Sequence, residues 1–292
     1  MLTTVYADDG VPLAVQEFGR RDAEVTLVFV HGHCLHAQSW AVLRAHLADA
    51  DVRMICYDHR GHGASGHADV ETYTIDQLAR DLHAVLEATT PSGPVVLVGH
   101  SMGAMTAMAY ARLFAEQLGG RVVGIGLIAS AASGVATLGL GRLLSHPVVR
   151  VLRAAVRRAP NAMHTSRQLG RFACAPIVRR AAHPGILALA NALLNETSVV
   201  TMSSFLDSIV AFDETETLAT LDIPTLVLCG EADQVTPFEH SAAIAQRLRD
   251  AQLVCVDGAG HGLILDRAAD VAAHIMNLVH RTRRSAPASL AG

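Results

Sequence analysis

The chain has 292 residues, enough to bury a large core in one α/β domain or in one domain with an insertion. Hydrophobic residues make up 51% of it and the formal net charge is only −4, which argues against a disordered chain and against a nucleic-acid partner. The N-terminal segment MLTTVYADDG contains no basic stretch and no apolar run, so we expect no signal peptide and a cytoplasmic location. The uncharged stretch 122–141 is long enough to span a bilayer, but its glycines and serines favour a strand followed by a loop.

Apolar, strand-like runs alternate with helical patterns along most of the chain. The first two runs, 3–7 and 12–18, flank the turn signal Asp9-Gly10 and predict an antiparallel hairpin. Further strands are predicted at 25–30, 52–58, 95–99, 122–129, 224–230 and 251–257. Helices are predicted at 39–48, 75–88, 102–118, 238–248 and 267–279. This alternation predicts an α/β fold with a mostly parallel sheet covered by helices on both faces, and a ligand site at the carboxyl ends of the strands.

The alternation breaks between residues 133 and 212, where prolines and helical patterns replace clear strands. A structureless loop of this length is unusual inside a compact domain, so we predict an inserted helical cap. The predicted organisation is a core in two parts, 1–132 and 213–280, with the cap at 133–212 and a flexible tail at 281–292.

The predicted cap has a one-sided charge. No Asp or Glu lies between Gln117 and Asn195, whereas nine arginines lie between Arg142 and Arg180. Two interpretations stay open. The arginines are solvated or pair with core carboxylates, or they draw the cap into peripheral contact with anionic lipid.

Residues 95–103 read VVLVGHSMG, a buried strand followed by a tight turn that carries Ser101. Gly99 and Gly103 lie two residues to either side of this serine, where the absence of a side chain lets the strand and the next helix pass close together. The pattern is typical of the strand-to-helix turn that presents a nucleophilic serine. The alternative is a glycine-rich turn with a structural serine.

A nucleophilic serine needs a base and an acid that orients the base. Asp233 lies in the loop after the predicted strand 224–230, and His261 lies between glycines in the loop after the strand 251–257. The order serine, acid, histidine along the chain is the one expected for this turn. Glu231, in the same loop as Asp233, is the competing candidate for the acid.

Backbone N–H groups near the serine are expected to stabilise the negative charge that develops on a substrate carbonyl. Met102 supplies one at the start of the following helix, and His33, next to Gly32, supplies another in the loop after the strand 25–30. An alternative use of His31, His33 and His36 as a metal site finds no support from nearby carboxylate or thiolate spacing.

The five cysteines do not have the spacing of a metal site. Three of them, Cys56, Cys229 and Cys255, lie inside apolar strand-like runs. We expect these three to be small buried side chains without disulfide partners.

Five segments, taken in chain order, resemble the successive motifs of the α/β-hydrolase superfamily and span nearly the whole chain. They are HGHCLHAQSW, YDHRGHGASG, GHSMG, GEADQVTP and GAGHGLILD. The resemblance is to capped members with a serine nucleophile, of the esterase and monoacylglycerol-lipase type, whose fold has about eight strands. It implies that Ser101 is the nucleophile, His261 the base and Asp233 the orienting acid. It further implies that the backbone N–H groups of His33 and Met102 form the oxyanion hole, and that neither a cofactor nor a metal takes part.

Two departures from the family pattern stand out. Ala104 follows Gly103 where many relatives have a second glycine, and His33 is a bulky polar residue at a variable position that can reach the acyl pocket. In the family, Asp58, Arg60 and Gly61 match a motif that is mainly structural.

A serine nucleophile argues against haloalkane dehalogenases and epoxide hydrolases, which use aspartate at this turn. The cap segments 185–195 and 202–210 are apolar and favour an acyl chain. We therefore predict a hydrolase of small-molecule carboxylic esters that works through an acyl-enzyme. The alternatives are a thioesterase, a C–C bond hydrolase, a cofactor-free perhydrolase, or a non-enzymatic member of the fold that only binds a ligand. The acyl length, the leaving group and the oligomeric state stay open.

Overall fold

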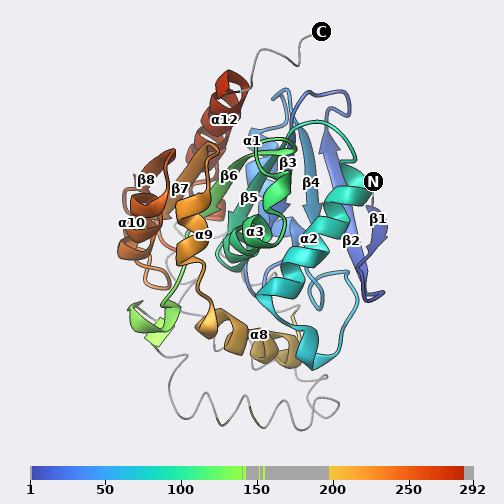
Figure 1. The fold of residues 1–292 in the computed structure, drawn as a ribbon, viewed down its shortest axis with the longest axis vertical. Helices are drawn as coiled ribbons and strands as arrows, with labels where there is room; N and C mark the ends of the chain where they lie inside the picture. The colour runs from blue at the N-terminus through green and yellow to red at the C-terminus, as the bar shows by residue number, and fades with distance from the viewer. Residues whose placement is uncertain (1, 140, 143–150, 152–153, 155–196, 286–292) are drawn as a thin grey trace.

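A sheet of eight strands forms the centre of the part of the chain that the structure describes (Figure 1). The computed structural model describes residues 2–139, 141–142, 151, 154 and 197–285. The strands are β1 (Leu2–Tyr6), β2 (Pro12–Gly19), β3 (Thr26–Val30), β4 (Arg53–Tyr57), β5 (Val95–His100), β6 (Val122–Ile128), β7 (Thr225–Gly230) and β8 (Ala251–Val256). Their order across the sheet is β1-β2-β4-β3-β5-β6-β7-β8, with β1 and β2 antiparallel to their neighbours and the other pairs parallel. The predicted fold class is confirmed.

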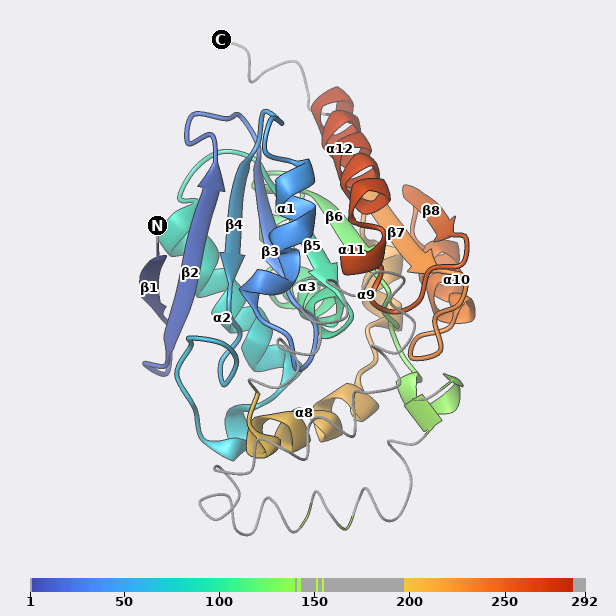
Figure 2. The ribbon, with the colours of Figure 1, turned by 180° about the vertical axis from the view of Figure 1, so that it is seen from behind.

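Helices cover both faces of this sheet. The face seen in Figure 1 carries α2 (Ile75–Thr89), α3 (Met102–Leu113), α9 (Thr215–Thr220) and α10 (Phe238–Arg247). The face seen in Figure 2 carries α1 (Ala41–His46), α11 (Leu263–Asp266) and α12 (Ala268–Ser285). Successive side chains of a strand point to opposite faces, so Val28 and Val30 of β3 enter the first core, whereas Leu27 and Phe29 enter the second. This two-sided burial explains why the strands are continuous apolar runs.

Two helices end five or more residues away from their predicted ends. The helix predicted to reach residue 118 ends at Leu113, where the ring of Phe114 stacks on His83 at 4.0 Å. The helix predicted to end at 279 continues to Ser285, so residues 281–285 are helical and do not belong to a flexible tail. Thr282 causes this extension, because it is buried against Gly124 of β6 although its neighbours are polar.

The described part of the predicted cap contains α8 (Val199–Ala211), which lies across the carboxyl ends of the strands (Figure 2). Its Phe205 packs against the rings of His33, His62 and Tyr73. The helical character of most of the cap and all of its arginines except Arg142 lie outside the described residues, so the cap boundaries and the lipid contact stay predictions. None of the described helices combines the length and the apolar character needed to cross a bilayer.

A buried arginine ties the N-terminal hairpin to the rest of the fold. Arg60 follows β4 and is fully buried. Its guanidinium binds the buried carboxylate of Asp81 on α2 through two hydrogen bonds of 2.6 and 2.7 Å, and it also binds Asp9 in the turn between β1 and β2 at 2.7 Å. Burial raises the pKa of Asp81 even though Arg60 opposes the shift. Arg60 is therefore structural, as the sequence indicated.

We expect Arg60→Met to lower the free energy of unfolding by about 3–5 kcal/mol, because the buried carboxylate of Asp81 would lose its partner. Arg20→Met is the matched control, since Arg20 pairs with Asp22 on the surface and its loss should change little. Urea unfolding followed by circular dichroism measures both variants. Similar losses in the two variants would contradict the structural role of Arg60.

Three buried histidines link the ends of β3 and β4. His31 donates from Nδ1 to the carbonyl of Gly32 at 2.8 Å, and its Nε2 accepts the backbone N–H of His59 at 2.9 Å. His59 donates from Nε2 to the carbonyl of His31, and His62 donates from Nδ1 to the carbonyl of Arg60, both at 3.0 Å. Burial lowers the pKa of His31 to about 3 and lowers the pKa of His59 and of His62 well below the ordinary value. All three rings are therefore neutral in the folded protein near pH 7.

These histidines should make the fold sensitive to mild acid. In the unfolded chain a histidine takes up a proton below about pH 6.5, whereas these rings resist protonation while buried. The unfolded state then binds more protons, so stability is fully present above about pH 6.5 and falls as the pH drops, by up to about 1.4 kcal/mol per pH unit and histidine. Urea unfolding at a series of pH values between 7.5 and 5 measures this slope, and a flat profile would contradict the burial of neutral rings.

Candidate active site

Ser101 lies on a strained turn between β5 and α3. Its backbone angles are φ 53° and ψ −118°, a region that residues with a side chain rarely adopt. Glycines on both sides are required by the packing: a Cβ on Gly99 would overlap the backbone of Gly103, and a Cβ on Gly103 would overlap the carbonyl of Val30. The turn therefore holds the Ser101 side chain at the carboxyl end of the sheet, as the sequence predicted.

A continuous chain of hydrogen bonds connects Ser101, His261 and Asp233. The Nε2 atom of His261 lies 3.1 Å from Oγ of Ser101, and its Nδ1 atom lies 2.8 Å from Oδ2 of Asp233. Both the carboxylate and the ring are buried. The structure thus brings together three residues that are separated by up to 160 positions in the sequence.

The protein surrounds Asp233 with donors that keep it ionised. Its Oδ1 atom accepts the backbone N–H groups of Val235 and Thr236 at 2.8 and 3.0 Å, and the Thr236 hydroxyl donates to Oδ2 at 3.0 Å. Burial raises the pKa of Asp233, but His261 and these backbone donors outweigh it and hold the pKa below the ordinary value. Sequence reasoning missed Thr236, which lies 3.3 Å from the His261 ring, because a threonine in a loop has no distinctive pattern.

The carboxylate of Glu231, the competing candidate for the acid, binds a backbone group of the next loop. Its carboxylate accepts the backbone N–H of Gly258 at 2.9 Å on the surface. This bond connects the loop after β7 to the loop after β8, and two backbone hydrogen bonds add to it, from Glu231 to Val256 and from Ala232 to Ala259. A Cβ on Gly230 would overlap the carbonyl of Ala259. The two loops that carry the acid and the base are therefore packed directly on each other.

His100 is a further residue that sequence reasoning missed. It precedes Ser101 in β5, and its Nε2 atom donates to the carbonyl of His261 at 2.9 Å. Burial lowers the pKa of His100 to about 3, so the ring is neutral and can hold the backbone of His261 without adding charge to the site. Its position inside the GHSMG segment is the only sequence signal for this role.

The predicted oxyanion donors lie on the two segments that border Ser101. Met102 is the first residue of α3, where a backbone N–H has no partner within the helix. The loop after β3 passes beside the serine, because a Cβ on Gly32 would lie 3.2 Å from Cβ of Ser101, and His33 is the next residue. Burial lowers the pKa of the His33 ring to about 4, which leaves it neutral.

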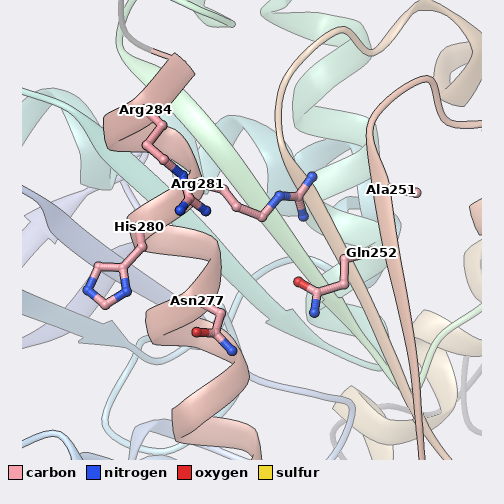
Figure 3. A pocket seen from close by; sticks show the side chains of 6 residues that line it. All are labelled: Ala251, Gln252, Asn277, His280, Arg281 and Arg284. Carbon is pink, nitrogen blue, oxygen red and sulfur yellow. The ribbon is translucent and has the colours of Figure 1, made fainter.

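The described residues contain no group of three or more metal-binding side chains with metal-site geometry. Both ring nitrogens of His31 are used by backbone groups, so this residue has no lone pair for a metal. A pocket of about 420 Å³ lies between α12 and the amino end of β8, lined by Gln252, Asn277, His280 and Arg284 among others (Figure 3). It lies at the opposite end of the strands from Ser101 and takes no part in this site.

Comparisons with known proteins agree with this architecture. A family model described as serine aminopeptidase S33 matches residues 21–268. A bifunctional esterase/perhydrolase of Acinetobacter calcoaceticus is 28% identical over 89% of this chain and 92% of its own, and a non-heme chloroperoxidase of Burkholderia pyrrocinia is 27% identical over 89% and 93%. A thermophilic esterase of Thermogutta terrifontis superimposes with a TM-score of 0.79 at 23% identity, over 97% of this chain and 99% of its own, which is a likeness of fold. The match to the family model covers most of the sequence, and the chain therefore belongs to the serine aminopeptidase S33 family of α/β hydrolases, as the resemblance of its motifs indicated.

Proposed function

We propose that this hydrolase cleaves carboxylic esters of small molecules with a largely apolar acyl part, through an acyl-enzyme on Ser101. The observation that carries the proposal is the unbroken hydrogen-bonded chain from Asp233 through His261 to Ser101 on its strained turn. The esterase names of several relatives and the apolar side chains that α8 buries near the strand ends support the choice of substrate class.

The proposed first step forms the acyl-enzyme. His261 accepts the proton of the Ser101 hydroxyl at Nε2 while Oγ attacks the ester carbonyl carbon. The backbone N–H groups of Met102 and His33 donate to the oxygen that becomes negative, and the dipole of α3 adds to this stabilisation. His261 then returns the proton to the departing alcohol. Asp233 stays ionised throughout and orients the ring.

The second step releases the acid. A water molecule gives a proton to Nε2 of His261 and attacks the acyl carbon, and the proton then passes to Ser101 as the carboxylic acid leaves.

In a perhydrolase, hydrogen peroxide replaces this water and the product is a peracid. Perhydrolysis is the second candidate activity, because the relatives include proteins named esterase/perhydrolase and non-heme chloroperoxidase.

Labelling with a fluorophosphonate probe tests the nucleophile directly, because such probes phosphonylate an activated serine. The wild-type protein should be labelled on the peptide that contains Ser101, and Ser101→Ala should not be labelled. Hydrolysis of p-nitrophenyl esters from acetyl to palmitoyl, beside an acyl-CoA and a vinylogous diketone, then ranks ester, thioester and C–C bond cleavage. Added peroxide with a peracid-sensitive dye reads out perhydrolysis. A chain that takes no label and cleaves none of these compounds would be a ligand-binding member of the fold.

We expect Ser101→Ala to lower kcat for ester hydrolysis by about 10⁴ or more, since no other group can replace the nucleophile. His261→Ala should lose nearly as much and the double variant little more, because the residues act as one unit. Ser101→Gly is a matched control for folding. It should be equally inactive but more resistant to urea than Ser101→Ala, because glycine is unstrained at a φ of 53°. Additive losses in the double variant would contradict the assignment of Ser101 as nucleophile and His261 as base.

Asp233→Asn should lower kcat by about 10³–10⁴, because an amide cannot stabilise the protonated His261 and favours the wrong tautomer. Glu231→Gln is the control in the same loop, and its kcat should stay within a few fold of the wild-type value because Glu231 only binds the N–H of Gly258. Steady-state kinetics on a short p-nitrophenyl ester measure both. A larger loss in Glu231→Gln than in Asp233→Asn would reverse the assignment of the acid.

A further inference from the structure

Two cysteines lie opposite each other at the base of the loops that carry Asp233 and His261. Cys229 of β7 and Cys255 of β8 are directly paired in the parallel register of the two strands. Cys229 is buried beneath α10, its thiol donates to the carbonyl of Val254 at 3.6 Å, and the side chains of Ser241 and Cys255 are its neighbours. Cys255 is exposed on the outer strand. The expectation that both would be buried is therefore wrong for Cys255, because β8 is at the edge of the sheet and pairs only with β7 among the described strands.

We propose that Cys229 and Cys255 form a reversible disulfide that regulates hydrolysis at Ser101. Neighbouring strands are about 4.8 Å apart, so the Cα atoms already lie within the range of disulfides. Side chains in register on parallel strands point the same way, which leaves the Cβ atoms farther apart than the mean of about 3.8 Å in disulfides. The bond therefore forms only if the two Cβ atoms approach each other by about 1 Å, which twists the ends of the two strands, and a disulfide under such strain is easily reduced.

The exposed thiolate of Cys255 starts the reaction with hydrogen peroxide. Its Sγ attacks one peroxide oxygen, which forms the sulfenic acid of Cys255 and releases hydroxide. Sγ of Cys229 then attacks the sulfur of the sulfenic acid, the S–O bond breaks, and the departing hydroxyl group takes the proton of the Cys229 thiol and leaves as water. The two thiols lose two electrons in total and the peroxide gains them. Burial raises the pKa of Cys229 to about 12, which suits the resolving thiol rather than the attacking one.

The pair is mechanically connected to the catalytic groups. Gly230 follows Cys229 directly and touches Ala259, and the backbone bonds from Glu231 to Val256 and from Ala232 to Ala259 join the loops immediately beyond the cysteines. A twist of the strand ends that moves the cysteines by about 1 Å therefore moves Asp233 relative to His261, and displacements of this size can cost up to a hundredfold in rate. This effect on hydrolysis rests on the proposed function, whereas formation of the disulfide does not.

Peptide mapping after oxidation tests the bond. The chain has no lysine, so trypsin cleaves at arginine and releases Cys229 in peptide 181–247 and Cys255 in peptide 250–267, each with a single cysteine. Peroxide treatment of the full chain should join these two peptides and remove two hydrogen atoms from the intact mass, and dithiothreitol should separate them. Oxidised wild-type protein without the joined peptide would overturn the proposal.

Kinetics after removal of the peroxide test the regulation. Oxidised wild-type protein should lose on the order of tenfold in kcat with little change in KM, and dithiothreitol should restore it. Cys255→Ser should hydrolyse esters like the reduced wild type and should resist oxidation, whereas Cys56→Ala, which removes a buried cysteine of β4, should respond like the wild type. A joined peptide with unchanged kcat would overturn the connection to the site. If the reduced protein neither hydrolyses esters nor takes the fluorophosphonate label, the proposed function is refuted. The peptide map still shows in that case whether the disulfide forms.

Discussion

The site depends on one steric constraint, the close passage of three backbones around Ser101. The end of β3, the end of β5 and the start of α3 approach so closely that Gly99 and Gly103 have no room for a side chain. This packing forces Ser101 into a positive φ and keeps it there, because relaxing the turn would separate α3 from the sheet. The same approach brings the loop after β3, with Gly32, to the side of the serine. The proposed nucleophile and the proposed oxyanion donors are thus positioned by the same packing.

The acid and the base reach this turn from the other half of the sheet. The strands β7 and β8 end side by side, and the loops that follow them bind each other through their backbones before they reach the site. Asp233 is solvated by protein donors in place of water, so its charge persists although it is buried. His261 is held from two directions, by Asp233 through its ring and by His100 through its carbonyl. The positions of Asp233 and His261 therefore depend on the packing of these two loops as well as on contacts of their own side chains.

Much of this arrangement could be predicted from the sequence, because it depends on local patterns. Apolar runs predicted the strands, and glycines at fixed offsets predicted the turn at Ser101. Asp233 and His261 each follow a predicted strand, which predicted that both lie at the carboxyl ends of the strands. Features that depend on contacts between distant segments leave no local pattern in the sequence. The extension of α12 to Ser285 follows from the burial of Thr282 against β6, and the pairing of Cys229 with Cys255 follows from the register of two strands. Likewise, only the folded structure shows that Asp233 binds His261 whereas Glu231, two residues before it, binds the backbone of Gly258.

The ion pairs of Arg60 also bear on how the protein folds in time. They join the turn at Asp9, the loop after β4 and the helix that carries Asp81, and Arg60 lies 51 positions from Asp9 and 21 from Asp81 in the sequence. A buried charge is stabilised only when all of these partners have docked, so the network closes after the strands and α2 have assembled. Interactions that form late stabilise the native state but not the transition state for folding. We therefore expect the ion pairs of Arg60 to slow unfolding more than they speed folding, and so to lengthen the lifetime of the folded enzyme.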